Sequence, residues 1–77
     1  MNTNPTKKKM PHSCTKKRLF EMYALDMSVK FMRKAINAII RENRGFPKNS
    51  VVYVMQLSPK ELQEFIDTYG LPRNYEQ

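Results

Sequence analysis

Basic and amide side chains recur along the stretch 28–45, where their types suit contact with an anionic ligand. No acidic residue interrupts positions 27–41, so the positive charges are not neutralised within that stretch. Arginine and asparagine can make paired hydrogen bonds to base edges, and the row would span roughly 21 Å of helix, the reach of a helix in or across a major groove. The alternative is a solvated helix face without a ligand. The candidate nucleic-acid-binding residues here are Lys30, Arg33, Lys34, Asn37, Arg41 and Arg44.

A second basic run lies nearer the N-terminus and comprises Lys16, Lys17 and Arg18. It follows three consecutive lysines, Lys7–Lys9, in the first residues of the chain. Two such runs are typical of a nucleic-acid-binding arm or a nuclear import signal. A solvated tail has the same composition. We add Lys16, Lys17 and Arg18 to the candidate nucleic-acid-binding residues.

Residues that could support catalysis or metal binding are few. His12 and Cys14 are close in sequence, but a structural zinc site needs four ligands and the chain has no other cysteine or histidine. A catalytic pair would need a rigid pocket and a third, orienting group. The acidic residues Glu61, Glu64 and Asp67 are expected to be solvated charges on an exposed helix face. We therefore predict no enzyme activity, no metal and no cofactor.

The stretch 28–45 must be a helix if its cations are to share one side. Its apolar residues recur at steps of three and four, the period of an amphipathic helix. Gly45 supplies a left-handed residue at the end, and two arginines suit the negative pole of the helix. One face is thus predicted to be buried and the other to carry the cations. The apolar residues are Val29, Met32, Ile36, Ile39 and Ile40.

The preceding stretch, 19–31, allows two interpretations. Its apolar residues continue the helical spacing, and either Ser13 or Thr15 could cap a helix that begins there. Residues 23–31 also alternate between apolar and polar side chains, as a half-buried strand does. We favour a helix with a break near residues 26–28, because no β-branched residue occurs between Leu19 and Ser28. The alternative is a strand followed by a helix.

Two further elements are expected in the C-terminal third. Residues 51–57 are rich in β-branched residues and carry no charge, which predicts one short buried strand. Ser58, Pro59 and Glu61 then have the spacing of a capping box and predict a helix that ends at Gly70. The fold class is therefore α+β and mostly helical, with two N-terminal helices (or strand then helix), one short strand and one C-terminal helix.

The domain organisation follows from composition. Residues 1–14 are predicted to be a flexible basic arm, residues 15–72 a single small domain, and residues 73–77 a C-terminal tail. A domain of this size buries only about 60% of its chain surface and is marginal alone. A lone strand also needs a partner for its backbone. Both arguments predict self-association, as a homodimer, or binding to another protein.

Charge is divided unevenly along the chain. Residues 1–50 hold twelve basic and three acidic residues, whereas residues 51–77 hold two basic and four acidic ones. A basic half favours a polyanionic partner, with DNA preferred over RNA, and a regulatory role such as that of a phage-encoded or chromosomal DNA-binding protein. The alternative is a small inhibitor or adaptor of mobile-element type that docks its basic face, or strand 51–57, on a host protein. We expect a cytoplasmic location, or a nuclear one in a eukaryotic host, and no membrane span.

The stretch 23–55 faintly resembles ribbon-helix-helix repressors. A ribbon, a helix, a glycine-containing turn and a second apolar segment follow one another, with Gly45, Asn49, Ser50 and Tyr53 in corresponding places. The resemblance implies that residues 23–31 form the ribbon of an α+β fold. The sequence departs from that pattern at Pro59, which makes the second helix too short.

Overall fold

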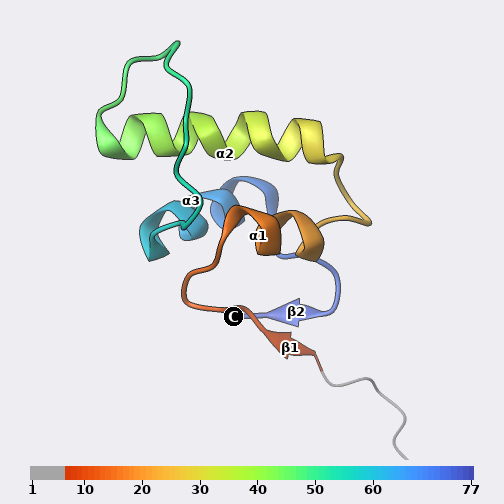
Figure 1. Ribbon diagram of the computed structural model, residues 1–77. Coiled ribbons are helices and arrows are strands. Elements are labelled where there is room, and N and C mark those ends of the chain that lie inside the picture. Colours follow the sequence, from red (N-terminus) through yellow and green to blue (C-terminus); the bar gives the residue numbers. More distant parts are fainter. Residues whose placement is uncertain (1–6) are drawn as a thin grey trace, which may run out of the picture.

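Three helices and one pair of short strands make up the computed structural model, which describes residues 7–77 (Figure 1). This arrangement confirms the α+β, mostly helical fold class. The elements in chain order are β1 (Lys8–Lys9), α1 (Lys16–Met22), α2 (Val29–Arg44), α3 (Pro59–Tyr69) and β2 (Tyr75–Glu76).

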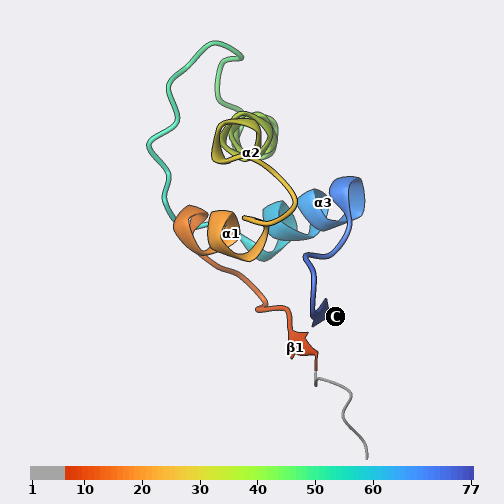
Figure 2. The same cartoon turned by 90° about the vertical axis from the view of Figure 1, so that its right-hand side faces the viewer.

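The longest element is α2, and its sequence fixes both of its ends. The Ser28 side chain accepts a hydrogen bond from the backbone N–H of Phe31 at 3.1 Å, which satisfies one free donor of the first turn. Gly45 ends the helix with a φ of +70°, a conformation that costs glycine little. The predicted helix is confirmed. Figure 2, which looks down α2, shows α1 and α3 on the same side of it.

The core lies between α2 and the other two helices. One stripe of α2 is fully buried there, and its side chains are spaced by four residues. Tyr23 and Phe65 meet edge to face across the core, with ring centroids 5.1 Å apart. The buried residues of α2 are Met32, Ile36 and Ile40.

Residues 16–22 form a helix, so the helical interpretation of the ambiguous stretch is confirmed. Thr15 caps α1 by accepting a hydrogen bond from the Arg18 backbone N–H at 3.1 Å. The chain then turns, with the Asp26 N–H bonded to the Tyr23 carbonyl, before Ser28 starts α2. The strand alternative for residues 23–31 is wrong because Ser28 draws the end of that stretch into a helix. The chain therefore lacks the ribbon of the ribbon-helix-helix pattern.

The capping box that begins α3 is confirmed. Ser58 accepts from the Glu61 N–H at 3.1 Å, and Glu61 accepts from the Ser58 N–H at 2.8 Å. Pro59 occupies the first turn, where its missing N–H leaves no bond unmade. These contacts fix where α3 starts and how it meets α2.

The strand predicted for residues 51–57 is not formed. The segment is extended, but its only ladder contact within residues 7–77 is an antiparallel bridge between Thr15 and Gln56. Two hydrogen bonds flank that bridge, from Lys16 N–H to Met55 O at 2.8 Å and from Leu57 N–H to Cys14 O at 2.9 Å. The pairing stops there because the stretch that contains Thr15 becomes helix α1 at Lys16, and a helix cannot pair with an extended segment.

The chain termini pair with one another instead. Lys8 and Lys9 of the predicted flexible arm form β1, which runs parallel to β2 in the predicted tail. Cys14, also assigned to the arm, is buried in the core. The first six residues of the arm lie outside the described residues. Local composition could not indicate this pairing, because its hydrogen bonds join residues more than sixty positions apart.

Tyr23 provides a test of the core. Its hydroxyl donates to the Gly70 carbonyl at 2.6 Å, and burial, with the nearby Cys14 and Asp26, raises the pKa of Tyr23 to about 12. A raised folded pKa gives stability that is complete below pH about 10 and is lost as pH rises toward about 12. We expect the free energy of unfolding to fall over that range, and to fall less steeply in Tyr23→Phe, in denaturant titrations.

The matched control for this experiment is Tyr53→Phe, measured with the chain at about 1 µM or less so that self-association does not contribute, because the Tyr53 side chain is exposed. This variant should follow the wild-type curve. Identical slopes for Tyr23→Phe and the wild type would contradict the assignment.

Candidate functional site

Three of the predicted cations gather where α1 faces α2. Lys16, in the first turn of α1, is only 7% exposed. Burial lowers the pKa of Lys16, and the charges of Arg33 and Arg41 lower it further. Within residues 7–77 none of the three forms an ion pair with an acidic side chain. We call Lys16, Arg33 and Arg41 the cationic cluster.

Contacts with neutral groups hold the cluster in place. The Arg33 guanidinium lies over the Phe20 ring of α1, 5.7 Å from its centroid. The Arg41 Nε donates to the Ser50 carbonyl at 2.8 Å. Neither contact neutralises a charge, and each leaves other guanidinium N–H groups available. The side chains of Arg33 and Arg41 are therefore held in place while their positive charges remain without an acidic partner among the described residues.

Asn37 lies one helical turn from both arginines of the cluster. Its amide oxygen is buried and has no hydrogen-bond partner among the described residues. A half-turn of the amide exchanges oxygen and nitrogen, so this position can present either an acceptor or a donor. A buried polar group of this kind marks a place where a water or a ligand would complete the hydrogen bonding.

Two further predicted cations extend the cluster along α2. Lys30 and Lys34 are exposed and lie one turn apart, on the side of the helix that carries Arg33. They have no ion pair in the part of the chain that the structure describes. We call the five residues Lys16, Lys30, Arg33, Lys34 and Arg41 the basic face. Lys17 is exposed on α1 beside it.

Arg44 is not available to a ligand. Its Nε and Nη2 donate to the two carboxylate oxygens of Glu61, each at 2.8 Å, and Nη2 also reaches the Gln56 carbonyl at 3.2 Å. The prediction that Glu61 is a solvated surface charge is wrong, since its side chain is 1% exposed. The hydrogen bonds from Arg44 hold the pKa of Glu61 below its usual value.

Arg18 points away from the basic face. Its Nη2 lies 3.2 Å from the Tyr75 hydroxyl in β2, and its Nη1 is 4.0 Å from Glu21. Phe20 and Lys16, by contrast, occupy the side of α1 that meets the arginines of α2. The structure thus separates Arg18 from the cations of α2, with which the sequence grouped it.

The extended segment 50–57 covers the second half of the predicted row of cations. Arg41 holds one end of the segment through Ser50, and Arg44 holds the other through Gln56. Figure 1 shows this segment crossing α2. The whole length of α2 therefore cannot lie in a DNA groove in the way that the sequence predicted. The absence of charge in residues 50–57 was the one sequence signal for this packing.

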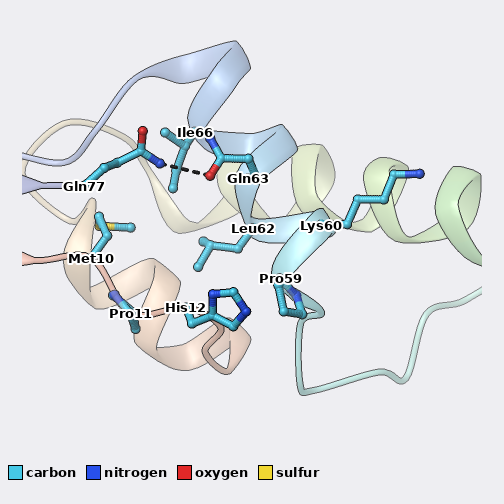
Figure 3. A pocket seen from close by; sticks show the side chains of 9 residues that line it. All are labelled: Met10, Pro11, His12, Pro59, Lys60, Leu62, Gln63, Ile66 and Gln77. Atoms are coloured by element: carbon cyan, nitrogen blue, oxygen red, sulfur yellow. Dashed lines mark hydrogen bonds between the residues drawn. The ribbon is translucent and has the colours of Figure 1, made fainter.

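A pocket of about 430 Å³ lies elsewhere, between residues 10–12 and α3 (Figure 3). His12 and Lys60 line it together with apolar side chains, and a hydrogen bond of 2.9 Å joins Gln77 to Gln63 at its edge. Cys14 does not line this pocket; burial raises the pKa of its thiol. Among residues 7–77 no three histidine, cysteine or acidic side chains gather in a way that could hold a metal.

Comparison with protein-family models, with curated proteins and with solved structures found no match. None of the helices within residues 7–77 has both the length and the apolar character that crossing a bilayer requires.

The Arg44–Glu61 pair predicts a pH-dependent stability difference. We expect Arg44→Ala to lower the free energy of unfolding by about 2 kcal/mol, because it leaves a buried carboxylate without its cation. A depressed folded pKa gives stability that is present above the ordinary carboxyl pKa and is lost as pH falls through the lowered value. The gap in unfolding free energy between Arg44→Ala and the wild type should therefore narrow as pH falls below about 4.3, the ordinary glutamate pKa, in denaturant titrations.

Lys34→Ala is the control for this prediction, since it removes an exposed cation from the same helix. Its effect should stay within about 0.5 kcal/mol at every pH. Equal losses of unfolding free energy in the two variants would count against a structural role for Arg44. So would a difference between Arg44→Ala and the wild type that does not change with pH.

Proposed function

We propose that this protein binds nucleic acid by contacting phosphates with its basic face. The observation that carries the proposal is the cationic cluster, in which Lys16 is buried beside two arginines without a neutralising acid. Like charges held together in a partly desolvated place favour an anion from outside. Four acidic residues are engaged elsewhere, each with a cation outside the basic face. These ion pairs are Lys9–Glu76, Arg18–Glu21, Arg44–Glu61 and Arg73–Asp26.

The dimensions of the basic face suit a regular polyanion. From Lys30 to Arg41 the row covers about 16 Å of α2 at 1.5 Å per residue. Duplex DNA carries one negative charge per about 1.7 Å of its axis, so a row of this length faces a dense array of phosphates. Guanidinium groups bind phosphate through two parallel hydrogen bonds, and lysines add point charges. Duplex DNA is the ligand that such a rigid row fits best.

Phosphate contact, rather than reading of bases, is the mode that the geometry favours. The sequence predicts base contacts from Asn37 and from the arginines of the row, Arg33, Arg41 and Arg44. In the structure Arg44 is bonded to Glu61, and Asn37 is half-buried. Contacts to phosphates position a protein on the duplex without specifying its sequence. We therefore propose binding with little sequence preference, in the cytoplasm or nucleus where nucleic acid is found. A protein that binds in this way would regulate transcription by occupying many positions along DNA and not by recognising one operator sequence.

Charge removal from the basic face should weaken DNA binding strongly. We expect the combined variant Lys30→Ala, Arg33→Ala and Lys34→Ala to lose at least about tenfold in affinity, and its log–log salt slope to shrink by about 2 to 3. Fluorescence anisotropy with a labelled duplex at several salt concentrations measures both quantities.

A matched variant removes the same charge from other surfaces. Lys48, Lys60 and Arg73 are exposed cations outside the basic face and outside both N-terminal basic runs, so replacing all three with alanine keeps the net charge equal. Affinity should change by less than about threefold. Equal losses in the two variants would show that net charge, and not this face, binds DNA. Absence of salt-dependent binding in the wild type would instead favour docking on an acidic protein.

Lys16 offers a sharper test of the cationic cluster, the observation on which this proposal depends. Lys16→Met keeps a stem of similar length and removes the crowded charge. If the charge serves a ligand, the variant should bind DNA less tightly and yet be as stable as the wild type or more so, because repulsion from Arg33 and Arg41 is relieved. Thermal unfolding and anisotropy give the two readouts. A destabilised variant with unchanged affinity would contradict the proposal.

A further inference from the structure

Residues 51–55 form an extended segment that is fixed in place but unpaired. Val51, Tyr53 and Met55 are 67%, 83% and 64% exposed, whereas Val52 and Val54 pack against the core. The segment thus has the two faces of a half-buried strand. In Figure 2 it stands to one side of α2 as an open arc.

The backbone of this segment offers free hydrogen-bonding groups. No backbone N–H or C=O of residues 51–54 has a hydrogen bond within residues 7–77. The segment is nevertheless held at both ends, by Arg41 at Ser50 and by Lys16 N–H at Met55. A backbone segment that is extended, fixed at both ends and unpaired is a template to which another strand can add. Within residues 7–77 the neighbouring stretch cannot supply the missing strand, because it becomes helix α1 at Lys16.

We propose that a second copy of this chain supplies the missing strand, by antiparallel pairing of the two 51–55 segments about a two-fold axis at Tyr53. In that register Tyr53 lies beside Tyr53 of the second copy, and Val51 lies opposite Met55 of the second copy. Every exposed apolar residue of the segment then meets another, as self-complementary pairing requires. A second copy is favoured over an acidic partner because residues 50–57 carry no charge. The chain has a formal net charge of +7, and this segment is where two copies can meet without opposing cations.

The exposed area is enough for a weak dimer. At about 200 Å² for an aromatic side chain, Tyr53 and the neighbouring Phe46, which is 38% exposed, leave about 240 Å² uncovered. Val51 and Met55 expose a similar area, so two copies would cover on the order of 1,000 Å² in total. A shallow hollow of about 450 Å³, lined by Phe46, Pro47, Val51 and their neighbours, adjoins Tyr53 and extends the contact. Interfaces of this size lie at the lower limit for specific complexes, which predicts dissociation in the micromolar range.

Charge placed at residue 53 tests the two-fold pairing. Sedimentation of the full chain, from about 1 to about 500 µM and without nucleic acid, should show a monomer–dimer equilibrium. Tyr53→Lys and Tyr53→Glu should each weaken dimerisation at least about tenfold, since like charges would meet on the axis. An equimolar mixture of the two variants should restore the dimer as a heterodimer. Rescue by mixing requires residue 53 of one copy to face residue 53 of the other.

The control pair is Leu25→Lys and Leu25→Glu. Leu25 is 78% exposed and lies in the turn between α1 and α2, away from the segment. These variants should dimerise as the wild type does, and circular dichroism melts should show all four variants folded. A wild-type chain that stays monomeric at about 500 µM would overturn the proposal. So would a dimer that charge at residue 53 leaves intact, or a mixture that restores nothing. The test is independent of DNA binding, so either proposal can fail alone.

Discussion

The ion pair between Arg44 and the buried carboxylate of Glu61 is the contact on which the rest of this structure depends. Glu61 accepts from the Ser58 backbone and closes the cap of α3, while Arg44 ends α2 and also holds the Gln56 carbonyl. One carboxylate thus joins the end of α2, the start of α3 and the segment between them. A buried carboxylate is tolerable only when it is paired and hydrogen-bonded, and here both conditions are met.

The position of the segment 50–57 is a consequence of this junction. Arg44 fixes one end and Arg41 the other, so the connection between α2 and α3 is drawn across the side of α2. Val52 and Val54 then turn inward and the alternate residues remain outside. The same geometry engages Arg41 and Arg44 in hydrogen bonds to the segment and leaves the backbone of residues 51–54 unpaired within residues 7–77. The two surfaces that we assign to binding therefore share one structural cause.

Compensation of charge is uneven in this small protein. Within residues 7–77 the acids that form ion pairs do so with cations outside the basic face. Lys16 is buried, and the charges of Arg33 and Arg41 lower its pKa, so its charged form is disfavoured in the folded protein. Because a domain this small has little stability to spare, we take this uncompensated charge as support for the proposed anionic ligand. That reasoning supports nucleic-acid binding more directly than the overall charge does.

The sequence by itself determined where the helices lie. Ser28, Gly45 and the capping box at Ser58 act on backbone groups within a few residues, so their spacing was enough to predict the ends of α2 and the start of α3. Only the tertiary structure decided which cations are free, because Arg44 finds Glu61 seventeen residues away and Arg18 finds Tyr75 in β2. The pairing of β1 with β2 and the unpaired state of residues 51–54 were likewise decided there. Such contacts join distant parts of the chain, and local propensity carries no information about them.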